Sequence, residues 1–103
     1  MPKKKKSPVK KSATNHSPTK VGNKVFIRTV THFFTGLIVA LTKETISLKD
    51  CAWIADTGRF GEALRTGNLN EIEPYPDGVI VDVSRGAVID TSTWNHALPR
   101  SAK

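Results

Sequence analysis

The sequence predicts a mainly β protein, in which one small domain follows a disordered, lysine-rich N-terminal arm. The chain has 103 residues, which is enough for one domain and too few for two. Residues 1–24 hold eight lysines and no acid, whereas residues 25–103 hold eight Lys or Arg and all nine acids. After residue 24, β-branched and aromatic side chains stand in short runs separated by turn-forming residues, a pattern typical of β domains.

The arm, residues 1–24, carries a formal charge of +8, and the rest of the chain carries −1. Its only sizeable apolar side chains are those of Met1, Val9 and Val21. Burying these three could not offset an ordering cost of roughly 1–2 kcal/mol per residue. We therefore expect residues 1–24 to be disordered and residues 25–103 to form the folded domain.

The first half of the domain predicts three strands. Residues 25–31 are rich in β-branched side chains, and residues 33–41 form a second apolar run. Gly36 within that run marks an expected bulge or bend. Residues 45–49 alternate polar and apolar side chains, so they should pair with the second strand across a short turn.

A short helix is predicted near the middle of the domain. Residues 50–56 fit either a fourth strand or the approach to this helix. Asp56-Thr57 supplies an expected N-cap, and Gly67 an expected end. Between them, Phe60, Glu62, Ala63 and Leu64 give an amphipathic pattern.

The last third of the domain predicts an irregular connection and a closing hairpin. Residues 68–78 are rich in Asn, Pro and Gly and should form the connection. Residues 79–83 and 87–90 flank a turn and should pair with each other, and residues 94–98 should pack back on the domain. The whole pattern predicts a small SH3-like or Sm-like β-barrel of about five strands with one short helix.

Catalysis has little support in this sequence. None of the three histidines has metal-ligand spacing to another histidine or to Cys51: His16, His32 and His96. Cys51 lies in an apolar run and is interpreted as a small buried hydrophobe. Two pairs of acids are interpreted as solvated turn residues: Asp50 with Asp56, and Glu71 with Glu73. We expect a protein that is not an enzyme and that uses no metal and no cofactor.

The arm contains one unit twice, ten residues apart, as Ser7-Pro8-Val9-Lys10-Lys11 and Ser17-Pro18-Thr19-Lys20. Both copies resemble the Ser-Pro-basic motifs in the tails of linker histones and related DNA-compacting proteins. Ser-Pro favours a compact turn, after which lysines can meet phosphates along a groove. We expect sequence-independent binding of nucleic acid, or of another polyanion, by Lys3, Lys4, Lys5, Lys6, Lys10, Lys11, Lys20 and Lys24. The alternative is a solubilising tail with no specific partner.

One run in the domain stands out, Trp53-Ile54-Ala55-Asp56-Thr57-Gly58-Arg59-Phe60. Together with residues 27–29 and 85–88, it resembles a family of small uncharacterised proteins from tailed bacteriophages and prophages. The resemblance spans roughly residues 25–99 and leaves out the arm. It implies a phage origin, with the host cytoplasm or the virion as the location.

Five side chains are candidates for a recognition surface: Arg28, Trp53, Arg59, Phe60 and Arg85. Aromatic and arginine side chains together can hold a partner protein, a nucleotide or a stacked base. The alternative is structural, and for the two aromatic residues we favour it, because aromatics dominate small cores. In that alternative the arginines pair with Asp56, Asp82 or Asp90.

We expect a phage-encoded structural or accessory protein, associated with the virion or the genome. Its domain would self-assemble into a homo-oligomer or dock on a capsid-type protein, and the clustered arms would then bind nucleic acid together. The alternative is a host-takeover or anti-defence protein whose β domain binds a host protein or a small nucleotide. No run of eighteen apolar residues is present, so we expect no membrane partner.

Overall fold

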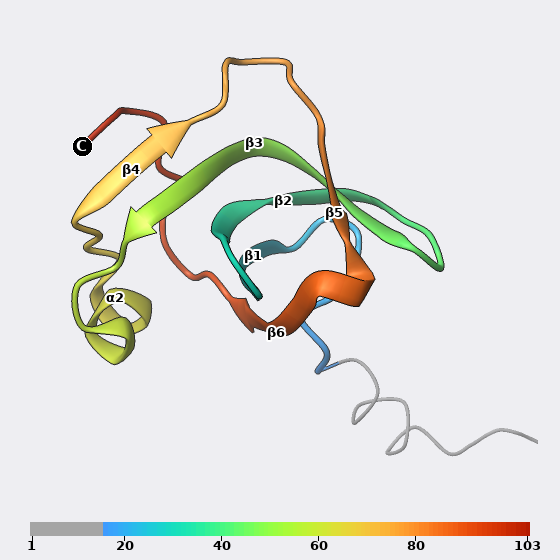
Figure 1. Ribbon diagram of the computed structural model, residues 1–103, viewed down its shortest axis with the longest axis horizontal. Helices are drawn as coiled ribbons and strands as arrows, with labels where there is room; N and C mark the ends of the chain where they lie inside the picture. Colours follow the sequence, from blue (N-terminus) through green and yellow to red (C-terminus); the bar gives the residue numbers. More distant parts are fainter. Residues whose placement is uncertain (1–15) are drawn as a thin grey trace, which may run out of the picture.

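The computed structural model of the chain describes residues 16–103 (Figure 1). In chain order the elements are β1 (Lys24–Thr29), β2 (Phe33–Leu41), β3 (Thr45–Asp56), α2 (Phe60–Thr66), β4 (Glu71–Pro74), β5 (Val81–Ser84), the 3₁₀ helix η1 (Arg85–Ala87) and β6 (Val88–Thr93). The predicted mainly β architecture with one short α-helix is confirmed. Most of the arm for which disorder is predicted, residues 1–15, lies outside the described residues.

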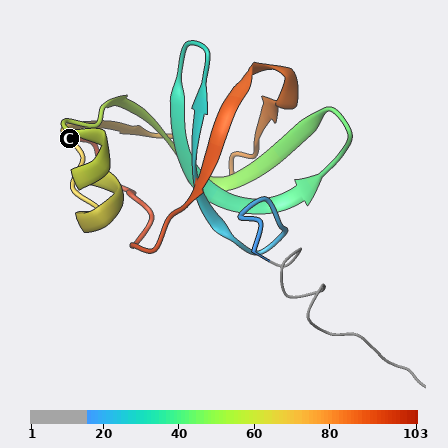
Figure 2. The same ribbon diagram turned by 90° about the horizontal axis from the view of Figure 1, so that it is seen from below.

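The six strands form one antiparallel sheet in the order β4-β3-β2-β1-β6. β5 pairs with the first half of β3, residues 45–48, and β4 pairs with its second half, residues 52–56. The strands curl strongly (Figure 2), but within residues 16–103 no ladder joins β5 to β6. The sheet therefore stays open, and strand pairing does not close it into the expected barrel.

The last third of the domain differs from the prediction in two places. β4 lies inside residues 68–78, which were predicted to be irregular, because Ile72 buries its side chain in the core between two exposed acids. Pro74 ends this strand, a position where its missing amide donor costs little. The predicted closing hairpin is also wrong, since η1 redirects the chain so that β5 pairs with β3 and β6 pairs with β1.

β3 continues through residues 50–56. The sequence left two alternatives for this segment, a fourth strand or the approach to the helix. Asp50 is an extra residue in this strand, and its φ of 50° lies in the left-handed region that Asp tolerates. Opposite it, the register of β2 against β3 shifts between Thr35 and Leu37. The residue between them, Gly36, is where a bulge or bend was predicted, and that prediction is confirmed.

Both faces of the sheet are buried, as β1 shows most clearly. Val25, Phe26 and Ile27 follow one another and are all 0% exposed, although successive side chains of a strand point to opposite faces. Val25 and Ile27 belong to one core cluster with Ile38, Leu48 and other residues of the sheet. Phe26 belongs to a second cluster, which α2 and the C-terminal segment cover. The short chain thus supports two apolar layers on one sheet.

α2 spans the residues in which the helix was predicted, and Gly67 ends it with a φ of 83°. The predicted N-cap is wrong. Arg59 occupies that position and its side chain caps nothing. Asp56 instead uses Oδ1 to accept a hydrogen bond from the amide of Gly58 at 2.8 Å, which shapes the turn before the helix.

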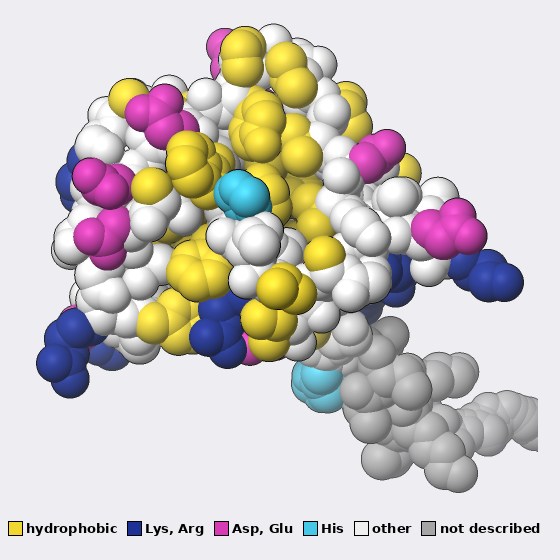
Figure 3. All heavy atoms as spheres, viewed as in Figure 1, with side chains coloured by type: hydrophobic (Ala, Val, Ile, Leu, Met, Phe, Trp, Pro, Cys, Tyr) yellow, Lys and Arg dark blue, Asp and Glu magenta, His cyan; other side chains and the backbone are white. Residues whose placement is uncertain are grey.

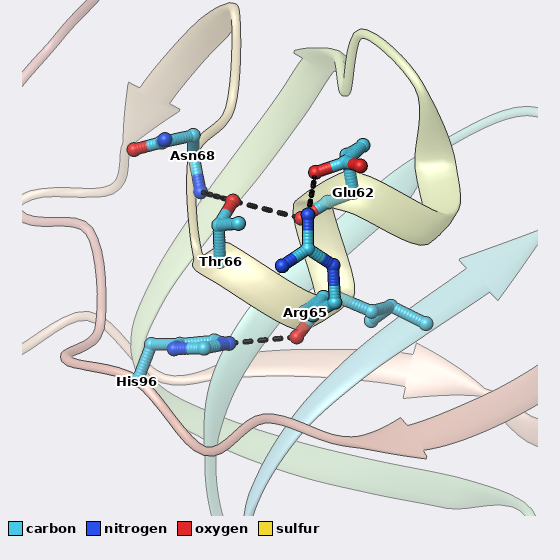
Figure 4. Close-up of polar contacts among 6 residues, drawn as sticks. Glu62, Arg65, Thr66, Asn68 and His96 are labelled. Carbon is cyan, nitrogen blue, oxygen red and sulfur yellow. Dashed lines mark hydrogen bonds and ion pairs between the residues drawn. The ribbon is translucent and has the colours of Figure 1, made fainter.

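The C-terminal end of α2 is tied to the rest of the molecule by polar contacts (Figure 4). The hydroxyl of Thr66 donates to the carbonyl of Glu62 and accepts from the amide of Asn68. His96 Nε2 lies 2.7 Å from the carbonyl oxygen of Leu64, so a carbonyl near the end of the helix has a partner from the C-terminal segment. The segment after β6 therefore holds the helix in place.

Residues 94–98 were expected to pack back on the domain, and this is confirmed. Trp94 is 1% exposed within the second core cluster, and its Nε1 donates to the carbonyl of Ala97 at 3.1 Å. Farther along, Arg100 donates to the carbonyl oxygens of Cys51 and Tyr75, at 3.1 and 2.8 Å. The C-terminal segment thus connects α2, β3 and the residues after β4.

Candidate recognition surface

Arg28 and Phe60 lie together on the face that α2 covers. The guanidinium carbon of Arg28 is 4.6 Å from the ring centre of Phe60, and Phe60 packs against the second core cluster. Arg28 Nε donates to Asp90 Oδ1 at 2.9 Å, and Arg28 Nη2 pairs with Asp90 Oδ2. This hydrogen bonding raises the pKa of Arg28 and lowers the pKa of Asp90. The structural alternative is confirmed for both residues, which link β1, β6 and α2.

Arg59 and Arg85 are exposed, and neither side chain makes a hydrogen bond or ion pair with the described residues. The pairings proposed for them in the structural alternative are therefore absent from this part of the chain. Asp82 instead accepts a hydrogen bond from Ser47 at 2.6 Å. Arg59 lines two hollows beside α2, of about 460 and 440 Å³.

Trp53 lies on the opposite face of the sheet from Phe60. Its chain neighbours Ala52 and Ile54 belong to the second core cluster, and Trp53 points the other way with 38% of its surface exposed. The core position that the sequence favours for Trp53 is wrong. The five candidates consequently do not form one surface, because the sheet separates Trp53 from Arg28 and Phe60.

A groove of about 240 Å³ lies beside Trp53 and is lined by Trp53, Glu73, Pro74, Tyr75 and Pro76, here called the Trp53 groove. Trp53 and Glu73 are direct partners in the register of β3 against β4. Burial raises the pKa of Tyr75, with a smaller effect from the neighbouring Cys51. The walls are thus mainly ring side chains, with one carboxylate among them.

Further ring side chains extend the apolar surface around the groove. The ring centre of His32 is 5.6 Å from that of Trp53 and 6.2 Å from that of Phe34. Figure 3 shows hydrophobic side chains gathered across this view of the molecule, with one histidine among them and acids around the edge. Sequence reasoning missed Tyr75 and the two prolines as site residues, although the run Pro74-Tyr75-Pro76 was visible.

Glu71 and Glu73 stand on either side of the buried Ile72 in β4, so both side chains point to the face that Trp53 occupies. Both side chains are exposed and make no hydrogen bond or ion pair within the described range. They were interpreted as turn acids, but they belong to a strand. Their position gives the surface around the groove a negative charge.

Two of the predicted phosphate-binding lysines, Lys20 and Lys24, belong to the described residues. Lys24 begins β1, and its amino group donates to the carbonyl of His96 at 2.6 Å. Ordered contacts begin still earlier, since the amide of Gly22 donates to the carbonyl of Ile38. The other six lysines lie outside the described residues.

The second Ser-Pro unit of the arm forms the compact turn that the sequence predicts. The amide of Thr19 donates to Ser17 Oγ at 3.2 Å, and the amide of Lys20 donates to the carbonyl of Pro18 at 2.9 Å. The side-chain amide of Asn23 also donates to Pro18, at 3.1 Å. This copy of the unit therefore forms a local turn, which is joined to β2 through Asn23, whose carbonyl accepts a hydrogen bond from the amide of Ile38.

Cys51 is a buried thiol. Cys51 is 0% exposed, and burial raises the pKa of its thiol to about 12, so it is protonated at neutral pH. No group of three or more His, Cys, Asp or Glu residues in this part of the chain could hold a metal ion. None of its helices is long and apolar enough to cross a membrane.

The chain matches no protein-family model, no curated protein and no solved structure. The resemblance to phage proteins stays a prediction based on the run from Trp53 to Phe60. What supports a function is the chemistry of the arm and of the Trp53 groove.

Proposed function

We propose that this is a phage-encoded, non-enzymatic structural or accessory protein of the virion or genome. Its arm binds nucleic acid without sequence preference, and its β domain self-assembles or docks on another protein. The observation that supports this proposal is the separation of charge along the chain. Eight lysines and no acid precede residue 25, whereas the remainder carries a net charge of −1.

The domain adds little attraction for phosphate. Three of its arginines pair with acids of the same domain, as Arg28 with Asp90, Arg65 with Glu62 and Arg100 with Asp77. The amino group of Lys24 already donates a hydrogen bond to the carbonyl of His96. The lysines at positions 3–6, 10 and 11 would then supply most of the phosphate contacts. Each contact changes the slope of log affinity against log salt by about −0.9 on duplex DNA.

Gel-shift titration of the full chain at several salt concentrations tests the arm. We expect Lys5→Gln with Lys6→Gln to reduce the salt slope by roughly two, because two phosphate contacts disappear. Lys43→Gln with Lys49→Gln removes the same charge from two exposed positions of the domain and serves as the matched control. Equal losses in the two double variants would contradict a special role for the arm.

In the alternative function, the β domain binds a host protein or a small nucleotide. One observation favours it, the Trp53 groove. The groove measures about 240 Å³. Pockets for drug-sized molecules measure about 300–1,000 Å³, so the groove suits a short peptide segment better than a nucleotide. Native mass spectrometry of protein from infected cells distinguishes the two functions. A bound host subunit supports the alternative, and presence in purified virions supports the first proposal.

A further inference from the structure

The Trp53 groove has the chemistry of a site for an extended proline-containing peptide. Trp53, Tyr75 and the rings of Pro74 and Pro76 give it stiff apolar walls. Aromatic-lined grooves bind polyproline II segments because such segments are already extended and lose little entropy on binding. The indole N–H of Trp53 has no hydrogen-bond partner within the described residues, so it can donate to a peptide carbonyl.

The acids beside the groove select a basic peptide. Glu73 lines the groove. Glu71 precedes it by two residues and lies on the same side of β4, so at the usual rise of a strand the two residues are about 7 Å apart. Both lack a basic partner within the described residues. A lysine here could pair with a carboxylate and lie against the face of Trp53. A phosphate backbone would instead be repelled.

The arm of this chain contains a segment that fits both features. In Ser7-Pro8-Val9-Lys10-Lys11, a proline precedes two lysines by two and three residues. In polyproline II geometry these lysines lie about 6 and 9 Å beyond the proline. A polyproline II segment has three residues per turn, so with Pro8 in the groove beside Trp53, Lys11 would face the same side as Pro8, toward the acids of β4. The second unit of the arm is already folded into a compact turn, in which the carbonyl of Pro18 accepts a hydrogen bond from Asn23, so it is not extended in the same way.

Both ribbon views place the first described residues and β4 at opposite ends of the domain (Figures 1 and 2). An arm that leaves one end can readily meet the groove of a neighbouring molecule. We propose that the Trp53 groove binds residues 7–11 of a second copy of this chain. The contact is head-to-tail, so it can extend along a row of copies. It does not depend on DNA binding, although DNA would compete for the same lysines.

Sedimentation equilibrium of the full chain at low salt, without nucleic acid, tests the contact. We expect self-association that weakens at least tenfold in Trp53→Ala and in the variant Pro8→Ala, Lys10→Gln, Lys11→Gln. Ile89→Ala, at a residue 61% exposed and outside the groove, is the matched control for the first change. Lys3→Gln with Lys4→Gln removes the same charge as the second change and leaves the unit intact.

A mixing experiment tests whether the contact joins two copies. Trp53→Ala keeps a normal arm, and the arm variant keeps a normal groove. We expect each to be monomeric alone and the mixture to form a one-to-one heterodimer. Reversing the acids with Glu71→Lys and Glu73→Lys should abolish self-association, and adding Lys10→Glu and Lys11→Glu to the same chain should restore it.

Three results would overturn the inference: a monomeric wild type, unchanged association in Trp53→Ala, or no heterodimer on mixing. Circular dichroism confirms the fold of each variant, and Glu73→Gln provides a second groove variant at an exposed position. The failure of this inference is separable from that of the proposed function. Trp53→Ala leaves every arm lysine in place, so it should still shift DNA; loss of self-association with DNA binding retained would separate the two, whereas loss of DNA binding in the lysine variants concerns the proposed function alone.

Discussion

Arg28 shows how one residue can fit a recognition surface in the sequence and a structural role in the fold. An arginine near exposed aromatics is typical of a binding site, but here the guanidinium lies over Phe60 and pairs with Asp90. The partners come from α2 and β6, so a single side chain connects three elements. With side chains 35% and 42% exposed, the ion pair is a modest contribution that solvent partly screens.

The pH dependence of stability should report this pair. The folded-state pKa of Asp90 is lowered, chiefly by its hydrogen bond to Arg28, so the pair stabilises the protein above the ordinary Asp pKa of about 3.9. That contribution is lost as the pH falls through the lower, folded-state value. We expect Asp90→Asn to lower the melting temperature at pH 7 and the difference from wild type to shrink below pH about 4.

Glu62→Gln is the matched control for Asp90→Asn, because its ion pair with Arg65 is more exposed, at 69% and 55%. A smaller difference is expected there at every pH. A difference between Asp90→Asn and wild type that persisted unchanged well below pH 3 would show that the ion pair is not its cause.

At the level of elements, the pairing of β2 with β3 depends on a close approach at Gly36. A Cβ added there would lie 3.0 Å from Leu48 Cβ and 3.2 Å from its Cδ1. Leu48 is 0% exposed in the first core cluster and has no free space into which to move. The glycine therefore permits the close approach of β2 to β3 at the point where their register shifts.

Gly36→Ala should destabilise the protein by about 1–3 kcal/mol, the usual cost of extra atoms in a packed core. Gly61→Ala is the matched control, because a Cβ there meets nothing within 4 Å and the residue lies in α2. It should be neutral or stabilising by up to about 1 kcal/mol, since Ala is the better helix former. Urea unfolding of both variants measures the difference, and equal effects would argue against crowding at Gly36.

At the scale of the whole molecule, the two tryptophans differ in their surroundings, since Trp94 is buried in the core and Trp53 lines the groove. Trp94 is 1% exposed and contacts Phe26 and His96, with ring centres 5.8 and 4.8 Å away. It joins the C-terminal segment to the core that α2 covers. Trp53 lies on the other face with no such burial.

Trp94→Ala should lower the free energy of unfolding by about 3–5 kcal/mol, as for other large aromatic truncations in a core. Trp53→Ala should cost less than Trp94→Ala, because 38% of the Trp53 surface is already exposed. Denaturant unfolding followed by circular dichroism measures both. Similar losses would mean that Trp53 is structural and would weaken its assignment to a binding groove.

The sequence by itself determined the features that depend on neighbouring residues. These are the first three strands, the bend at Gly36, the helix that ends at Gly67, the turn at Ser17-Pro18 and the separation of charge. The structural features follow from the conformational propensities of neighbouring residues, and the charge separation follows from counting charged residues. Arg28 and Trp53 are candidates for a recognition surface because of their residue types. The neighbouring residues in the sequence could not show which of the two side chains would face solvent.

Only the tertiary structure decided the site. Trp53 and Glu73 are twenty positions apart, and β4 brings them together although its sequence looks like a proline-rich loop. Much of the sheet is covered on both faces. Polar–apolar alternation could therefore not show that Trp53 in β3 would stay partly exposed. Burial depends on what packs against a strand from elsewhere in the chain, and that information exists only once distant segments have paired.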